Sequence, residues 1–219
     1  MEYELIRSRR KTAVLRITPE GKLEVRAPMR YPVGRLEEFL ESKREWIEQK
    51  QQEALSRAAA RERFAPEIGG TSLLLGRKYP IWEGEKAEFS GDAFYVSPQK
   101  AVKPQLIQIY REQARKDILR RVEKFSGRVG VSPLSVRING ASTRFGSCSG
   151  ENRLNFSWKI ILSEPELVDY VVVHELCHIL EHNHSARFWK QVERNVPDYR
   201  ERQERLKTFG KMLLEQNWE

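Results

Sequence analysis

The stretch VVVHELCHILEHNHSARFW, residues 171–189, contains every histidine of this 219-residue chain. The four are His174, His178, His182 and His184. An imidazole can bind a metal or transfer a proton near neutral pH. Because the chain uses no histidine elsewhere, the segment predicts one dedicated site, and the fold around it is inferred outward from here.

The residues before the histidines predict a helix over residues 164–181. Ser163 is suited to the N-cap, Glu166 follows three residues later as in a capping box, and Pro165 falls in the first turn. An apolar run then leads into the first histidine. We therefore expect a well-defined helix to carry the start of the histidine segment.

On that helix, His174 and His178 are four residues apart and lie on the same face, where both can bind one ion. Glu175 lies between them in sequence. This is the His-Glu-x-x-His pattern, in which two imidazoles bind zinc and the glutamate acts as general base. The pattern predicts a zinc site with Glu175 as its catalytic residue.

A third ligand has to come from a segment that turns back after the helix. If the helix continued, His182 would lie about 12 Å along the axis from His174, whereas zinc–nitrogen bonds are about 2 Å long. Asn183 tolerates the left-handed conformation that ends helices, and Ser185 can cap the next helix. We predict that His182 lies outside the site and that the metal ligands are His174, His178 and His184.

Three neutral imidazoles with one open position are typical of catalytic zinc sites, whereas structural sites fill all four positions. A bound metal lowers the pKa of its water toward about 7, and Glu175 can accept the proton that is released. The sequence therefore predicts a zinc-dependent hydrolase. The ligand set also leaves nickel and manganese open.

The first half of the chain predicts a small β-rich module with a long helix, which we assign to residues 1–100. Alternating apolar residues indicate a hairpin over 12–27, a helical stripe covers 34–63, and short strand-like runs occupy 71–97. Together with the second half, these elements indicate the α+β fold class.

The second half, residues 101–219, predicts the zincin-like hydrolase core. A long helix opens near Pro104, and strands follow at LSVRI and at LNFSWKI, residues 154–160. The clean alternation of LNFSWKI predicts a half-buried strand near a sheet edge. Such a strand is a candidate for pairing with an extended substrate, although a role within the sheet alone is at least as good an interpretation.

Charge and cysteine content indicate which partners and which cellular compartment to expect. The chain has 39 basic and 31 acidic residues, a net charge of +8, and basic residues outnumber acidic ones over residues 187–211. This excess is compatible with nucleic-acid or phosphate contacts, but a charge-laced helix surface is the favoured interpretation. Two cysteines, no signal-peptide pattern and no apolar run of about 20 residues predict a cytoplasmic protein without a membrane segment.

Residues 143–189 resemble the YgjP-like metallopeptidase family, a zincin group related to the SprT-like and WLM metalloproteases. The resemblance rests on Phe-Gly-Ser-Cys at 145–148, on Pro165 with Asp-Tyr-Val-Val at 169–172, on His-Glu-Leu-x-His at 174–178 and on Asn-His-Ser at 183–185. Phe145 stands where the family usually has tryptophan. Weaker likeness extends over most of the chain.

The resemblance implies zinc ligands at His174, His178 and His184, a catalytic Glu175 and a peptide or protein substrate. Metal-dependent hydrolysis of a phosphoanhydride, as in a nucleoside triphosphate pyrophosphatase, is the alternative, since fold does not fix function. A nucleic-acid-associated binding module is the third hypothesis, and it leaves Glu175 unexplained. The sequence does not determine the oligomeric state.

Arg144 and Tyr199 are weaker candidates, as groups that stabilise a developing oxyanion. Cys148 is a further candidate ligand or reactive thiol, but a small packed side chain is the favoured interpretation, as it is for Cys177. Phe188 and Trp189 are expected to anchor the helix after the motif to the core.

Overall fold

The computed structural model describes residues 2–218 and separates by its contacts into two compact units. The first ends at Phe64 and also takes in Met212–Asn217, and the second comprises Ala65–Lys211 and Trp218. The division by contacts thus falls before the short strands that the sequence analysis grouped with the N-terminal module. The boundary near residue 100 stays a prediction about which parts fold independently.

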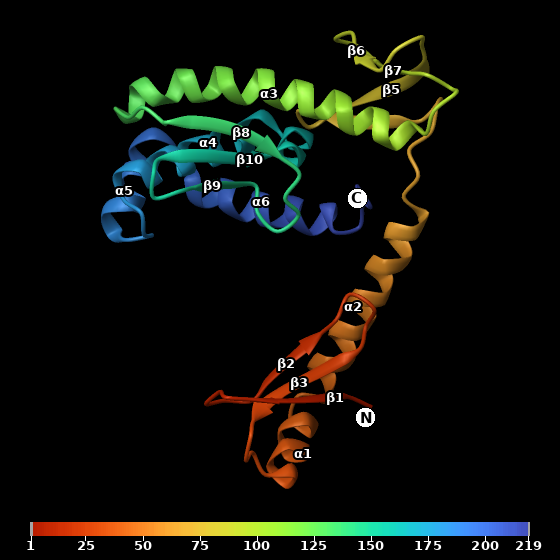
Figure 1. Cartoon of the computed structure of the whole chain (residues 1–219), viewed down its shortest axis with the longest axis vertical. Helices are drawn as coiled ribbons and strands as arrows, with labels where there is room; N and C mark the ends of the chain where they lie inside the picture. Colours follow the sequence, from red (N-terminus) through yellow and green to blue (C-terminus); the bar gives the residue numbers. More distant parts are fainter. Residues whose placement is uncertain (1, 219) are drawn as a thin grey trace. The chain divides into compact units, whose positions relative to one another are not determined.

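The first unit is a three-stranded sheet with two helices (Figure 1). Its elements are β1 (Glu4–Ser8), β2 (Val14–Ile17), β3 (Leu23–Pro28), α1 (Val33–Glu41) and α2 (Arg44–Arg63). The predicted hairpin is present as the antiparallel pair β2–β3, which turns at Gly21 with a φ of 80°. Strand β1 pairs in parallel with β3 and was not predicted individually.

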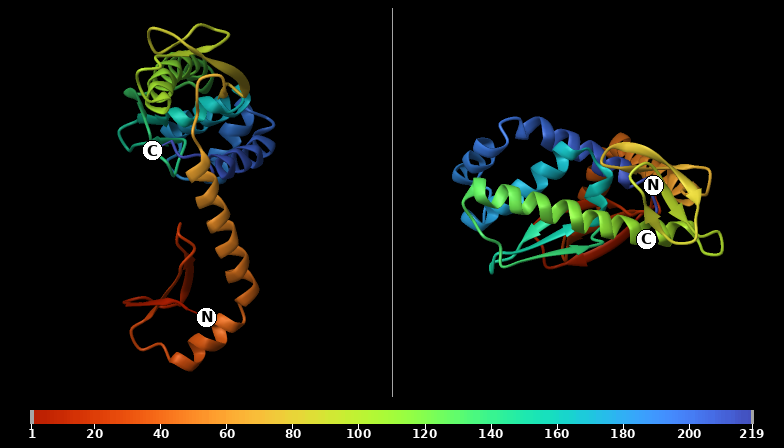
Figure 2. Two further views of the ribbon diagram at one scale, coloured as in Figure 1. Left: turned by 90° about the vertical axis from the view of Figure 1, so that its right-hand side faces the viewer. Right: turned by 90° about the horizontal axis from the view of Figure 1, so that it is seen from above.

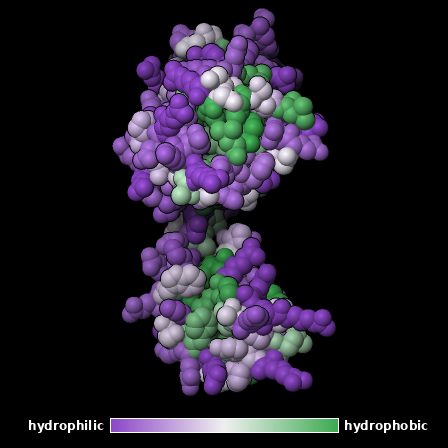
Figure 3. Space-filling model, turned by 90° about the vertical axis from the view of Figure 1, so that its left-hand side faces the viewer, coloured by the Kyte–Doolittle hydropathy of each residue, from purple (hydrophilic) through white to green (hydrophobic). Residues whose placement is uncertain are grey.

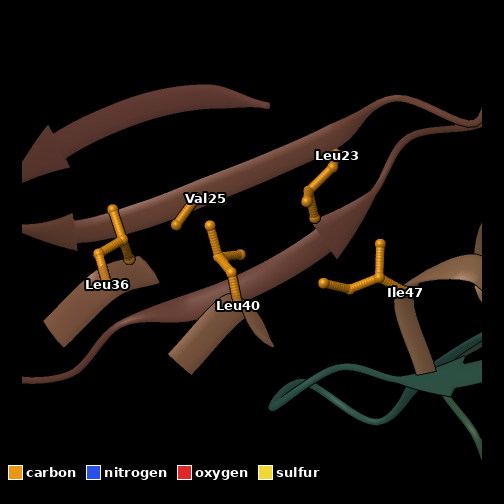
Figure 4. Close-up of a cluster of buried hydrophobic side chains, with 5 residues drawn as sticks. All are labelled: Leu23, Val25, Leu36, Leu40 and Ile47. Atoms are coloured by element: carbon orange, nitrogen blue, oxygen red, sulfur yellow. The ribbon is translucent and has the colours of Figure 1, made fainter. Parts of the chain in front are cut away.

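Alternate residues of β3 point into the core of this unit. Leu23 and Val25 lie against Leu36 and Leu40 of α1 and Ile47 of α2, and all five are buried (Figure 4). The single helix expected over 34–63 is two helices that meet at Ser42 and Lys43. Trp46, a large apolar residue of the second helix, is 41% exposed. The break lets both helices turn an apolar side toward the same small sheet.

The second unit begins with a four-stranded sheet in the order β4-β5-β7-β6. Its strands are β4 (Thr71–Leu74), β5 (Arg77–Glu83), β6 (Glu88–Phe89) and β7 (Phe94–Val96). Phe94 packs edge-on against Tyr110 of α3 (Val102–Val129), at 5.4 Å between ring centroids. These strands therefore pack on the long helix that follows them.

A second sheet positions the histidine helix. Its strands β8 (Ser135–Asn139), β9 (Gly146–Cys148) and β10 (Arg153–Ser157) are ordered β8-β10-β9. Strand β10 pairs in parallel with β8 and antiparallel with β9, so it is the central strand. The prediction of a sheet-edge position for LNFSWKI is therefore wrong, and this strand offers no free edge to a substrate.

The same segment leaves the sheet earlier than predicted, because Trp158–Leu162 forms a 3-10 helix, η1. Leu154, Phe156, Trp158 and Ile160 are all buried, as their alternation predicted. Alternation reports which side chains face the core, but it does not report where the ladder of hydrogen bonds ends.

Helices α4 (Pro165–Leu180), α5 (Ala186–Asn195) and α6 (Tyr199–Leu213) complete the structure (Figures 1 and 2). Helix α4 packs against α3, α5, η1 and β9. Its bounds agree with the predicted 164–181 to within a residue, but the predicted capping box is wrong. The N-cap is Glu164 without a side-chain bond, and the Ser163 hydroxyl donates to the Ile160 carbonyl at 2.7 Å.

Within residues 2–218, none of the helices has both the length and the apolar character needed to cross a membrane. On the face shown in Figure 3, each unit carries an area of hydrophobic residues surrounded by hydrophilic ones. In the first unit, Leu15, Phe39 and Trp46 line a shallow hollow.

Candidate metal centre

Three of the four histidines converge. His174 and His178 come from α4, His184 comes from the turn after it, and one nitrogen of each lies within 4.8 Å of the others. The Nε2 atoms of His174 and His184 are 3.2 Å apart. Two nitrogen ligands of a tetrahedral zinc ion, with bonds of about 2.05 Å, lie about 3.3 Å apart. The three side chains therefore fit the coordination of one small divalent cation.

The chain reversal that brings His184 back uses side-chain bonds. Helix α4 ends at Leu180, its C-cap Glu181 has an extended backbone, and the Ser185 amide donates to Asn183 Oδ1 at 3.1 Å. Ser185 caps α5 by accepting from the Phe188 amide at 3.3 Å, as predicted. The left-handed conformation expected of Asn183 is wrong, since the non-glycine residues with positive φ in the described chain are Leu75 and Asn152.

His182 is exposed and does not belong to the group, and Cys148 is not a member of it either. Among the described residues, His184 and not His182 therefore lies with His174 and His178.

Aromatic rings hold the imidazoles in place. Phe188, which is fully buried, stacks on His178 with 4.4 Å between centroids, and Trp189 stacks on His184 at 5.5 Å. Tyr199 stacks in turn on Trp189 at 5.2 Å. Phe188 and Trp189 thus do more than anchor α5, the role expected of them, because each also restricts the orientation of a histidine ring.

The protonation of the histidines suits metal binding. His178 Nδ1 lies 3.1 Å from the Glu181 carbonyl, to which only a protonated Nδ1 can donate, so Nε2 carries the lone pair. Burial, with His178 and His184 nearby, lowers the pKa of His174 to about 3, and burial also lowers the pKa of His178. His174 Nδ1 is buried without a hydrogen-bond partner among the described residues. Both helical imidazoles are therefore neutral at pH 7, which is the form that binds a metal.

Glu175 is buried next to the group, with 6% of its surface exposed. Burial raises the pKa of its carboxyl to about 8, and the charge of Arg144 opposes that rise. A carboxyl with a perturbed pKa beside a cluster of ligands is typical of a functional site.

Strand β9 reaches Glu175 through a glycine. A Cβ added at Gly146 would lie 2.6 Å from both the Cγ and the Oε1 atoms of Glu175. A side chain at position 146 therefore cannot coexist with the present position of the carboxylate. From the sequence, Phe-Gly-Ser-Cys is evident only as part of the family pattern, and the contact of Gly146 with Glu175 was not predicted.

The two cysteines differ in exposure but both favour the thiol form. Burial and the nearby Glu175 raise the pKa of the Cys148 thiol, and burial raises that of Cys177 to about 12. Protonated thiols are weak nucleophiles and poor ligands.

A cavity of about 370 Å³ opens beside Glu175 and His174. Helix α6 forms one wall and the start of β9 another, so segments distant in sequence create it. Its lining residues are Phe145, Gly146, Tyr170, Val171, His174, Glu175, Gln203, Leu206, Lys207 and Gly210.

Several basic residues of the 187–211 segment have acidic partners. Arg202 pairs with Asp198 at 2.9 Å, and Lys207 pairs with Glu204 at 2.6 Å. Arg205 pairs with Glu164. Exposed pairs of this kind add little stability, but they reduce the positive field that a polyanion would meet.

Three histidines with the spacing of metal ligands, next to a buried glutamate, define a candidate metal-dependent hydrolase centre. The family model described as YgjP-like, metallopeptidase domain, matches residues 11–209, and the chain belongs to this family. Membership confirms the resemblance stated from the motifs and implies a divalent metal.

Two solved structures are similar to part of the chain. The metallopeptidase zymogen abylysin of Pyrococcus abyssi is 24% identical with a TM-score of 0.39, and the match covers 42% of this chain and 92% of that one. The metallopeptidase zymogen jannalysin of Methanocaldococcus jannaschii is 18% identical with a TM-score of 0.38, covering 42% and 94%. A comparison with curated proteins gave no match.

Proposed function

We propose that the chain is a zinc-dependent peptidase whose metal is held by His174, His178 and His184. The observation that carries the proposal is the 3.2 Å approach of two Nε2 atoms beside a buried carboxyl. Family membership supports peptide hydrolysis over other metal-dependent reactions. An all-imidazole set of three donors suits zinc in a catalytic site.

A divalent metal in this position supplies Lewis acidity, which polarises a carbonyl group and lowers the pKa of a bound water. Glu175 then acts as general base, taking the proton of the attacking water at its carboxylate and returning it to the leaving nitrogen. The pKa of about 8 for Glu175 applies to the protein without a bound metal. That pKa falls when a cation lies nearby, because the cation favours the charged carboxylate.

The edge of the sheet suggests how a substrate is oriented. Strand β9 pairs with β10 on one side and is the last strand of the order β8-β10-β9, at the edge nearest α4. An extended peptide that adds to this edge passes Gly146 and therefore Glu175. The substrate-pairing role that the sequence analysis gave to LNFSWKI is thus proposed for β9 instead.

Arg144 remains a predicted stabiliser of the oxyanion, supported by its electrostatic effect on Glu175. The same role for Tyr199 has weaker support, because its ring stacks on Trp189 and its hydroxyl accepts from Arg200 Nε at 3.1 Å. A cytoplasmic location also stays a prediction.

Glu175→Gln tests the proposal. The variant keeps the shape of the side chain but cannot accept a proton, so we expect it to bind one zinc ion per chain and to lose peptide hydrolysis by about 10³-fold or more. Glu53→Gln is the matched control, because Glu53 is a partly exposed helical glutamate of the first unit, paired with Lys50.

Zinc content, digestion of an unstructured protein and phosphate release from a nucleotide panel are measured on the same preparations. Full peptide hydrolysis by Glu175→Gln would exclude Glu175 as the base. Release of phosphate or pyrophosphate, without any peptide cleavage, would select the phosphoanhydride alternative.

A further inference from the structure

We propose that the cavity between α4, α6 and β9 receives one large apolar side chain of the substrate, next to the bond that is cleaved. This inference rests on the proposed function, since it names the substrate residue that the same site selects. The cavity shares two of its lining residues, His174 and Glu175, with the candidate metal centre. A side chain that enters it therefore belongs to a residue at, or next to, the reacting carbonyl.

The walls are apolar where a side chain would enter. Phe145 lies before β9, Val171 lies one turn before Glu175 on α4, and Leu206 comes from α6. Phe145 is itself held by Phe209 of α6, with 5.6 Å between ring centroids. Small-molecule and side-chain pockets are typically lined in this way, with a few polar groups at one end.

Helix α6 presents one continuous face to the cavity. Gln203, Leu206, Lys207 and Gly210 follow the spacing i, i+3, i+4 and i+7, which places them on one side of a helix. The face is therefore built into the helical repeat and does not depend on the position of a loop.

Charge on the cavity rim does not favour an acidic side chain. Lys207 is the basic residue of the lining, and its Nζ atom donates to Glu204 Oε1 at 2.6 Å. Glu175, also in the lining, is acidic and buried, so it adds no positive charge that could pair with a substrate carboxylate. An aliphatic or aromatic side chain needs no such partner, and it gains from leaving water.

Gly210 gives direct control of the cavity volume. A Cβ at this position would meet one neighbour, Phe145 Cε2 at 3.8 Å, which is ordinary contact. Glycine is a poor helix former, so a larger residue at 210 does not weaken α6 by propensity. Gly210→Leu is therefore expected to fold with its side chain directed at Phe145, into the space the substrate would use.

Gly127 offers a matched control. It lies in α3, outside the cavity lining, and a Cβ there would meet nothing within 4 Å. Gly127→Leu makes the same chemical change in a helix, and differences between the two variants report the cavity alone.

The first experiment measures binding and needs no catalysis. Zinc-loaded wild type, Gly210→Leu and Gly127→Leu are titrated with acetohydroxamate and with 3-phenylpropanohydroxamate, two chelating probes that differ in an apolar arm. We expect the phenyl probe to bind wild type and Gly127→Leu about 10- to 100-fold more tightly than acetohydroxamate. In Gly210→Leu that ratio should fall at least tenfold. Equal ratios in all three proteins would overturn the proposal.

The second experiment reads specificity from cleavage of a mixed peptide library. Wild type and Gly127→Leu should show one enriched class, large apolar residues, at one position flanking the cleaved bond, and Gly210→Leu should shift that position toward small residues. Cleavage with no preference there, or a preference that Gly210→Leu leaves intact, would overturn the pocket while the peptidase proposal stands. Normal probe ratios without cleavage of any peptide would overturn the peptidase proposal and leave the cavity assignment standing.

Discussion

Helices α2 and α4 are both long, yet they are stabilised in opposite ways. Of the 20 residues of α2, only Ile47 and Ala54 are buried, whereas nine of the 16 residues of α4 are buried. Helix α2 is rich in alanine and has local ion pairs such as Lys50–Glu53 at 2.7 Å. Helix α4 contains three consecutive valines, which are poor helix formers, so packing decides its conformation.

The comparison shows which polar residues require a functional explanation. A glutamate on α2 faces water at little cost, and its presence requires no explanation. Glu175 on α4 is buried, which raises the free energy of its charged form. The cost of burying Glu175 supports the chemical role proposed for it beside the histidines.

Among changes in and next to α4, removal of one histidine should have the largest effect. His184 is exposed, so His184→Ala should fold normally, but it removes one of three predicted ligands. We expect zinc affinity to fall at least 100-fold and peptide hydrolysis to fall about 10³-fold, equivalent to about 4 kcal/mol. Metal titration and hydrolysis rates measure both.

The control for this change is His182→Ala, which removes an exposed histidine two residues away that lies outside the group. Zinc affinity should stay within twofold of wild type. If both alanine variants lost zinc equally, the assignment of His184 as the third ligand would be wrong.

A direct test of the two helices compares Leu176→Ala in α4 with Leu55→Ala in α2. Leu176 is fully buried and Leu55 is 48% exposed. Truncation of the buried leucine leaves a cavity and should reduce the free energy of unfolding of its unit by about 3 kcal/mol. The exposed leucine should cost less than about 1 kcal/mol. Urea unfolding followed by hydrogen exchange assigns each loss to a unit, and similar losses would refute the contrast.

A third prediction concerns the strand that α4 packs on. A methyl group at Gly146 would collide with Glu175, so Gly146→Ala should displace the carboxylate while leaving the histidines in place. We expect hydrolysis to fall about 30-fold, equivalent to about 2 kcal/mol, with unchanged zinc content. Gly150→Ala is the control, because its Cβ would meet nothing within 4 Å. Equal rates for the two variants would show that Gly146 does not position Glu175.

The sequence predicted the parts of the site that are local. His174, His178 and Glu175 follow from helical spacing, and His184 follows from the length of an imidazole–metal bond compared with the rise of a helix. The α+β class and the β2–β3 hairpin follow from periodicity, and the structure confirms both. These inferences need only neighbours along the chain.

The parts that were missed depend on residues far apart in sequence. The contact of Gly146 with Glu175 joins residues 29 apart in the chain, and the cavity wall formed by Leu206 and Gly210 comes from a segment more than 30 residues after Glu175. The central position of β10 depends on which strands flank it, which alternation does not encode. The wrong predictions for Ser163 and Asn183 have a local cause, because several different side-chain hydrogen bonds can satisfy the same helix end.

The smallest effect concerns the pH dependence of the metal-free protein. The pKa of Glu175 is about 8 when folded, above its ordinary value of 4.5, so its contribution to stability is present at low pH and is lost as pH rises toward 8. His174 has the opposite shift, with a folded pKa of about 3, and its contribution is complete once pH exceeds its ordinary value of 6.5. Between pH 6.5 and 8 the loss from Glu175 therefore dominates.

In that window we expect the free energy of unfolding of metal-free wild type to fall by about 1.5 kcal/mol relative to metal-free Glu175→Gln, which cannot ionise. Urea unfolding of both proteins at pH 6.5 and pH 8 measures the difference. Glu53→Gln should behave like wild type, because Glu53 ionises at the protein surface in both states. A parallel pH response in wild type and Glu175→Gln would mean that burial in α4 does not hold back the ionisation of Glu175, and the contrast with the glutamates of α2 would lose its electrostatic basis.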